Sequence, residues 1–148
     1  MPTSRDLPAD RAAVGQLLGR LLRQFRVELF APVAASEYSD LREPHLQIFG
    51  NIYGGARLTE LAARAQLSLA ATSELVNDLQ RLGYLERRPD PQDGRAKLIV
   101  PTTRGRAALA AAGDRVAEIE AQWARLIGRR RFAETCRALQ DLLDAIEE

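Results

Sequence analysis

The sequence predicts a mainly α protein with one small β-hairpin set between helical segments. Three observations predict this fold. A stretch rich in β-formers and arginines, Tyr84–Arg88, is followed by a β-branched apolar run, Lys97–Val100, with turn-forming residues between them. On both sides of this pair, apolar residues recur at helical spacing over long segments. Directly before it, two short helical patterns are joined by a turn of three to four residues, which is typical of a helix-turn-helix unit.

The connection inside the predicted hairpin, 90–95, is charged and rich in turn formers. Pro89 and Pro91 lack the N–H that a strand ladder needs, so we expect both in the loop and not inside a strand. Asp93-Gly94 is a hairpin-turn dipeptide, because glycine adopts the positive φ that a tight connection requires. The hairpin should therefore carry Arg95 outward at its tip and lean on neighbouring helices, since an isolated ribbon is marginal in water.

Length and charge limit the kinds of protein that this sequence can encode. The 148 residues fit one domain, or a small domain with an oligomerisation arm. The net charge is only +1, but the segment 81–106 carries seven basic residues against three acidic ones, a net +4 that leaves −3 for the rest of the chain. A local basic patch suits docking on a polyanion. On charge alone, a solvated arginine-rich surface is an equally good interpretation.

Cysteine and membrane signals exclude several classes of protein. Cys136 is the only cysteine, so no intramolecular disulfide and no thiolate metal cluster can form within one chain, which fits a reducing compartment. The N-terminus lacks the apolar segment of a signal peptide, and no apolar run approaches the length of a membrane span. We therefore expect a cytoplasmic protein with no metal, no cofactor and no membrane partner.

The first helix should begin after Asp10 and stop near Pro32, because the residue before a proline is steered away from the α region. A helix of this length at a chain end suggests packing against a partner subunit. A second helix opens at Glu43-Pro44, with proline in the first turn, and ends at Tyr53-Gly54-Gly55. The first helix presents one wide apolar face, formed by Val14, Leu17, Leu18, Leu21, Leu22, Phe25, Leu29 and Phe30.

The helix-turn-helix pattern follows. Thr59 can cap a short helix over Glu60–Gln66, and after a turn a longer helix runs over Leu69–Leu82 and is closed by Gly83. The inner face of the longer helix is predicted from Leu69, Thr72, Leu75, Val76, Leu79 and Leu82, and the outer face from Ser68, Ala70, Ala71, Ser73, Glu74, Asn77, Asp78 and Arg81. Small polar outer residues allow close entry into a major groove. A plain helical corner is the alternative, and the hairpin directly afterwards favours a winged helix-turn-helix.

After the hairpin, Pro101-Thr102 starts a long helix that breaks at Gly128. Arg129–Arg131 then read as a solvated turn, or as a second anion site at a helix start, where the dipole disfavours cations. A last helix should run from about Phe132, with Cys136 on its apolar face as an inert core residue. We therefore divide the chain into a winged helix-turn-helix lobe, 43–101, and an α-helical dimerisation arm, 1–42 and 102–148.

Specific residues resemble the MarR family of prokaryotic transcription regulators. The hairpin and its exit, from Asp90-Pro91-Gln92-Asp93-Gly94-Arg95 through Thr102 to Gly105, resemble the signature D-P-x-D-x-R…L-T-x-x-G. The helix-turn-helix matches are Glu60, Leu61, Ala62, Leu67, Ser68, Ser73, Leu75, Val76, Leu79 and Gly83. Together they cover about a third of the chain.

This resemblance implies a homodimeric regulator that binds a pseudo-palindromic duplex operator. Ser68, Ala70, Ala71, Ser73 and Asn77 would enter the major groove. Arg95 would reach into the minor groove, whose negative potential favours an arginine, with Asp93 bracing it. Arg87, Arg88 and Lys97 would contact phosphates.

Four positions depart from the family pattern. Gln66 stands where glycine is common in the turn, so the turn must be strained or differently shaped. Glu74 and Asp78 stand where arginines are common, and an acid facing phosphate is repulsive, although a carboxylate can accept from cytosine N4. Pro101 replaces a leucine and should only blunt the strand end.

The resemblance also implies a repressor that is released by a small aromatic or phenolic acid bound where the arm meets the lobe. Arg20, Arg23, Tyr38 and His45 are the candidate pocket residues, with a hydrogen-bonded interface histidine as the plainer interpretation of His45. Catalysis would need a nucleophile with a base, a carboxylate pair or a metal set, and the sequence offers none of these, so we expect no enzyme. A winged-helix module that binds protein partners is the alternative function, favoured by Glu74 and Asp78.

Overall fold

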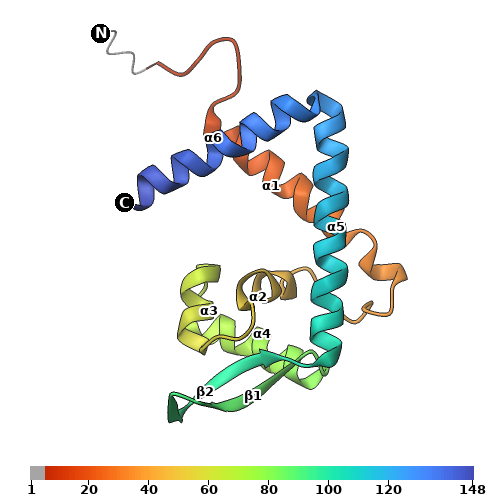
Figure 1. Cartoon of the computed structure of the whole chain (residues 1–148), viewed down its shortest axis with the longest axis vertical. Helices are drawn as coiled ribbons and strands as arrows, with labels where there is room; N and C mark the ends of the chain where they lie inside the picture. The colour runs from red at the N-terminus through yellow and green to blue at the C-terminus, as the bar shows by residue number, and fades with distance from the viewer. Residues whose placement is uncertain (1–5) are drawn as a thin grey trace.

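The computed structural model describes residues 6–148, and Figure 1 shows a lobe beneath a helical arm. The lobe contains α2 (His45–Ile52), α3 (Leu58–Ala65), α4 (Leu69–Arg81) and the hairpin of β1 (Leu85–Asp90) and β2 (Asp93–Pro101). The arm contains α1 (Val14–Phe30), α5 (Thr103–Ile127) and α6 (Arg129–Glu147). A short 3-10 turn, Val33–Ala35, follows α1. The predicted mainly α fold with one hairpin is confirmed.

The core of this fold lies inside the lobe. Its buried side chains come from α2, α3, α4, the hairpin and the start of α5, and include Ile48, Ile52, Leu61, Val76, Leu79, Tyr84, Leu85, Ile99 and Ala108. By contrast, α1 and α6 bury no residue in the single chain. Two helical predictions need correction: Leu69 is 52% exposed instead of facing the core, and Cys136 is exposed instead of buried.

Helix ends follow local chemistry with three changes from the prediction. α3 begins at Leu58, and Glu60 in its first turn accepts from the Arg57 N–H at 3.1 Å, so the predicted cap, Thr59, lies inside the helix. Thr102 begins α5 as predicted, with its hydroxyl accepting from Gly105 N–H at 3.1 Å. Leu82 caps the C-terminal end of α4 instead of belonging to it. Finally, α6 begins at Arg129, so Arg129–Arg131 form its first turn instead of a connection.

The hairpin differs from the prediction at its tip. The strands pair antiparallel from Leu85↔Pro101 to Pro89↔Lys97, so Pro89 lies inside β1. A two-stranded sheet has only edge strands, so the missing N–H of Pro89 is tolerated. Asp90 then pairs with Asp93, which places the turn at Pro91-Gln92 instead of Asp93-Gly94. The positive-φ glycines within residues 6–148 do not include Gly94, so the predicted glycine turn is wrong.

This register shift leaves three residues of β2, Gly94, Arg95 and Ala96, with no partner on β1. A bulge of this kind bends a strand and redirects the side chains on it. Arg95 therefore lies in a bulge of β2, and the bulge, instead of the turn itself, sets the direction of its side chain. The other edge of β2 makes a two-bond bridge to Ala56, with N–H···O distances of 2.8 and 2.9 Å, which fixes the hairpin to the segment before α3.

No helix within residues 6–148 combines the length and apolar character that crossing a membrane requires.

Candidate nucleic-acid interface

The turn between α3 and α4 sets the direction of α4. Gln66 adopts a left-handed conformation, φ 55° and ψ 43°, so the strained turn predicted for a residue in place of glycine is confirmed. After it, Ser68 caps α4 by accepting from the Ala71 N–H at 3.0 Å. The Ser68 hydroxyl is thus partly engaged in holding the helix, while its position stays at the exposed N-terminal end.

The predicted groove residues of α4 occupy one side of the helix but differ in exposure. Ser68, Ala70 and Asn77 are exposed, while Ala71 and Ser73 are half-buried. Glu74 is also exposed on this helix. Small side chains at the N-terminal half leave the backbone of α4 accessible from outside, as a recognition helix requires.

The first strand of the hairpin is joined to α4 through Arg87. Its guanidinium donates to Asn77 Oδ1 at 3.0 Å and to Gln80 Oε1. Arg88 pairs with Glu86 on the same strand. Asn77, predicted to enter the major groove, and Arg87, predicted to contact phosphate, are therefore in direct contact. As a result, α4 and the hairpin, which is the wing of the predicted winged helix-turn-helix, form one surface.

Most of the basic segment 81–106 is engaged within the chain. Arg104 pairs with Asp40 at 3.2 Å and covers the Tyr84 ring at 4.2 Å, and Arg106 donates to the Pro101 carbonyl at 3.1 Å. Within residues 6–148, Arg95 and Lys97 have no side-chain partner. Both are exposed on β2. The two cations left available for an external anion therefore lie together at the wing.

Asp93 supports the wing tip through the backbone. Its carboxylate accepts from the Arg95 N–H at 3.1 Å, so it shapes the bulge and leaves the guanidinium unrestrained.

A clasp that the sequence analysis missed holds the wing to the lobe. Arg57 pairs with Asp90 at 2.8 Å, and Asp90 also accepts from the Gln92 N–H at 2.9 Å. These hydrogen bonds, first from the Gln92 N–H and then from the Arg57 guanidinium, hold the pKa of Asp90 below its ordinary value. The Asp-Pro-Gln pattern is a signal for the local bond, because aspartate often accepts from the N–H two residues on. Nothing in the sequence indicates the partner 33 residues away.

Asp78 does not face outward as predicted. Only 18% of its side chain is exposed, and it pairs with Arg42 at 3.0 Å and with Arg81. His45, which is buried, places Nε2 3.7 Å from the same carboxylate. Loss of solvent raises the pKa of Asp78, but Arg81, His45 and Arg42 outweigh it and the pKa is lowered. Desolvation lowers the pKa of His45.

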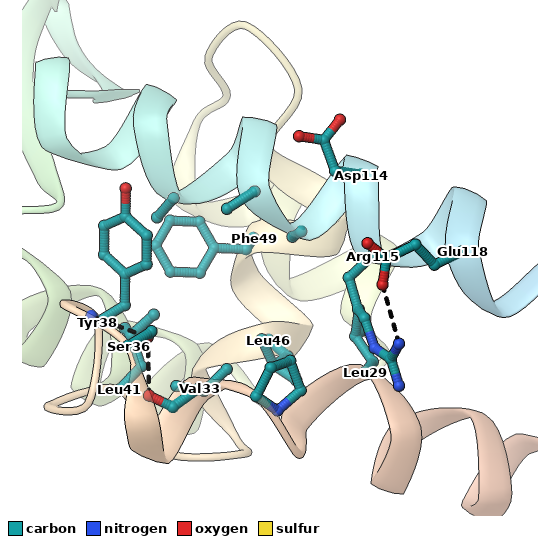
Figure 2. A pocket seen from close by; sticks show the side chains of 14 residues that line it. Leu29, Val33, Ser36, Tyr38, Leu41, Leu46, Phe49, Asp114, Arg115 and Glu118 are labelled. Carbon is teal, nitrogen blue, oxygen red and sulfur yellow. Dashed lines mark hydrogen bonds and ion pairs between the residues drawn. The ribbon is translucent and has the colours of Figure 1, made fainter.

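A cavity of about 320 Å³ lies between α1, the loop after it, α2 and α5 (Figure 2). Tyr38 lines it, whereas Arg20, Arg23 and His45 do not. Its cation is Arg115 of α5, whose guanidinium donates to the Glu28 carbonyl at 2.9 Å and to Glu118 at 3.0 Å. Figure 2 shows Arg115 and Tyr38 at opposite ends of the cavity. The remaining lining is mainly apolar and includes Leu29, Val33, Leu41, Leu46, Phe49 and Ala112.

Within residues 6–148, no cluster of three or more histidine, cysteine or acidic side chains is placed to hold a metal ion.

The winged lobe and the whole chain were compared with known protein families, sequences and structures. A model of the MarR family matches residues 39–96. None of the curated protein sequences compared matches the chain. Wild-type MarR from E. coli in its apo form is similar in structure, with a TM-score of 0.73 and 19% identity, and the match covers 90% of this chain and 98% of that one.

Two similar structures contain DNA. FabT from Streptococcus pneumoniae in complex with DNA has a TM-score of 0.74 at 17% identity, over 90% of this chain and 95% of that one. The transcriptional repressor CouR, bound to a 23-mer DNA duplex, has a TM-score of 0.65 at 25% identity, over 91% of this chain and 92% of that one.

Proposed function

We propose that this chain, whose residues 39–96 match a model of the MarR family, is a homodimeric transcription regulator that binds a pseudo-palindromic duplex operator. It would repress transcription until a small aromatic or phenolic acid releases it from the DNA. The family consists of transcription regulators and not of enzymes. The observation that carries the proposal is the pair of available cations, Arg95 and Lys97, on a hairpin that contacts α4 through Arg87. Such a regulator would act in the cytoplasm, where its operator lies.

The DNA contacts divide by role. Five residues at the start and along the outer side of α4 would enter the major groove: Ser68, Ala70, Ala71, Ser73 and Asn77. The bulge would deliver Arg95 to the flanking minor groove, where a narrow groove concentrates negative potential. Lys97, Arg88 and Arg87 would contact phosphates and fix the register without reading sequence. Arg87 would do so while braced by Asn77, which supports a fixed angle between wing and helix.

Dimerisation is supported by the apolar faces of the arm. In the single chain these faces are exposed on α1 at Val14, Leu17, Leu18, Leu21 and Leu22, and on α6 at Leu139, Leu142, Leu143 and Ile146. Contiguous exposed apolar surface of this kind marks an interface. A second copy of the chain would cover it and would present two lobes to the two halves of an operator.

Effector binding is proposed for the cavity of Figure 2. Its volume of about 320 Å³ suits one small ring, and Tyr38 and Phe49 supply aromatic walls. Arg115 is the residue we propose for a ligand carboxylate, because it is the lining cation. The candidates Arg20, Arg23 and His45 lie outside this lining, so any role for them would be indirect.

The test is duplex binding measured against salt. We expect the affinity for promoter DNA from upstream of the protein's own gene to fall steeply as salt rises, because phosphate contacts release counterions. Arg95→Ala should weaken binding by about tenfold without changing thermal unfolding. Arg130→Ala removes an exposed arginine of α6, far along the arm, and should leave binding unchanged. Equal affinity for wild type and Arg95→Ala would contradict the role of the wing.

A winged-helix module that binds protein partners is the second candidate. Exposed Glu74 on α4 favours it, because this acid would repel phosphate. Asp78 no longer supports it, since its charge is satisfied by Arg42 and Arg81. Absence of any duplex binding at low salt would favour this candidate over a DNA regulator.

A further inference from the structure

The carboxylate of Asp78 joins the recognition helix to the segment before it in the lobe. Asp78 lies on α4, while Arg42 precedes α2 and His45 begins it. The Arg42 guanidinium contacts Asp78 Oδ2 at 3.0 Å, and His45 Nε2 lies 3.7 Å from the same oxygen. Arg81, one turn along α4, contacts the other oxygen. The half-buried Asp78 carboxylate therefore interacts with side chains from both sides of the contact between α2 and α4.

The histidine in this contact has an incomplete hydrogen bond. His45 Nδ1 accepts from the Arg42 N–H at 2.9 Å, which places the proton of the neutral ring on Nε2. Within residues 6–148, Nε2 is buried and has no hydrogen-bond partner. A buried donor without a partner is costly, so a small approach of α4 toward α2 would be favoured by completing the bond to Asp78. A contact that completes this bond would hold α4 and α2 closer together than they lie in this structure.

The same segment forms part of the cavity wall. Leu41 and Leu46 line the cavity, as Figure 2 shows. Arg42 follows Leu41 directly and His45 precedes Leu46, so the two groups that reach Asp78 from outside α4 are adjacent in sequence to wall residues. Any occupant that displaces this wall must also displace the groups that hold α4.

We infer that Asp78 is a positioning residue for the recognition helix, and that the contact of Arg42 and His45 with Asp78 transmits the state of the cavity to α4. This inference rests on the proposed function and assigns a route of regulation to its site. It also gives a reason for an acid on a DNA-reading helix: the carboxylate orients the helix from behind and does not meet the DNA.

The first experiment compares Asp78→Asn with Glu74→Gln, which removes an exposed acid from the same helix. An operator selected from random duplexes and an unrelated duplex of equal length are titrated by fluorescence anisotropy. Asp78→Asn should weaken operator binding by about tenfold and leave binding of the unrelated duplex unchanged, because orientation matters only for base contacts. Glu74→Gln should tighten or preserve binding of both duplexes equally. Thermal unfolding of each variant establishes that it is folded.

If Asp78→Asn tightens both duplexes as Glu74→Gln does, Asp78 acts by its charge toward DNA and the inference is overturned. Wild-type protein that binds no duplex at all would instead overturn the proposed function, so the two failures are distinguishable.

The second experiment tests the route without a ligand. Ala112→Phe partly fills the cavity, since Ala112 lines it. In the otherwise wild-type protein we expect this change to alter operator affinity by about fivefold or more, and in the Asp78→Asn background by less than about twofold. Arg42→Gln should suppress the effect in the same way. Equal effects of Ala112→Phe in all three backgrounds, or no effect in the wild type, would overturn the route.

Discussion

At the scale of single residues, Gly105 shows why a glycine stands at the end of the wing signature. A Cβ on Gly105 would lie 2.0 Å from the Tyr84 carbonyl oxygen. That oxygen accepts from the Thr102 N–H at 3.0 Å, which holds the first turn of α5 against the start of the hairpin. The glycine is therefore required by a close approach of two backbones and not by an unusual φ.

We expect Gly105→Ala to lower the free energy of unfolding by about 2 kcal/mol or more, because the added methyl group forces the two backbones apart. The matched control is Gly113→Ala in the same helix, where a Cβ meets nothing within 4 Å. That change should stabilise by about 0.5 to 1 kcal/mol, since alanine is the better helix former. Urea unfolding measures both, and similar values for the two variants would contradict the packing argument.

Gln66 offers a second prediction at this scale. Its left-handed backbone, φ 55°, is unfavourable for any residue with a Cβ. Gln66→Gly should therefore raise the free energy of unfolding by about 1 kcal/mol. Ala65→Gly, at the last residue of α3, should lower it by about as much, because that residue is helical. A destabilising Gln66→Gly would show that the side chain has an unrecognised role.

At the scale of elements, the clasp between Arg57 and Asp90 fixes the hairpin on the lobe. The pKa of Asp90 is lowered in the folded protein by the Gln92 N–H and then by Arg57. The clasp's contribution to the free energy of unfolding is therefore complete above the unfolded pKa of about 3.9, and is lost as the pH falls through the folded pKa.

Asp90→Asn provides the measurement. We expect the difference in unfolding free energy between wild type and Asp90→Asn to shrink as the pH is lowered from about 6 to about 3. In the Arg57→Gln background the same difference should depend less on pH, because one of the two main donors to Asp90 is gone. A difference that does not change with pH would refute the clasp.

For the molecule as a whole, the apolar faces of α1 and α6, two helices of the arm in Figure 1, bury no residue in the single chain. Burial of apolar surface is the dominant favourable term in association, so these faces should determine the oligomeric state. Leu142, which is 52% exposed on the apolar face of α6, is a position where a charged substitution should disrupt such an interface.

One chain has a mass of 16.4 kDa, and we expect the wild type to sediment at twice that mass. The Leu142→Lys variant should sediment as a monomer and should no longer bind the operator. Asp141→Asn changes the charge by the same amount off the apolar face, and should remain dimeric. Analytical ultracentrifugation measures all three. A monomeric wild type would contradict the dimer at once.

Local patterns in the sequence account for the helices, the hairpin and their order along the chain. Apolar periodicity predicted the helices, and the proline at 32 and the glycines at 83 and 128 predicted where several of them end. The wing signature predicted a likeness to the MarR family, whose model matches residues 39–96. The missing turn glycine predicted the strain at Gln66. These features are local, because they depend on residues a few positions apart.

The pairs of side chains that contact each other across the fold follow from the packing of the lobe. Asp78 turns inward to Arg42 and His45, Arg57 reaches Asp90, and Arg115 supplies the cation of the cavity. The tip of the wing also escaped prediction, because a bulge, and not the Asp93-Gly94 dipeptide, absorbs the extra residues. Partners such as Arg57 and Asp90 are 33 positions apart. Their contact depends on how the lobe packs, and the packing of helices against a hairpin is a property of the whole core that no local pattern encodes.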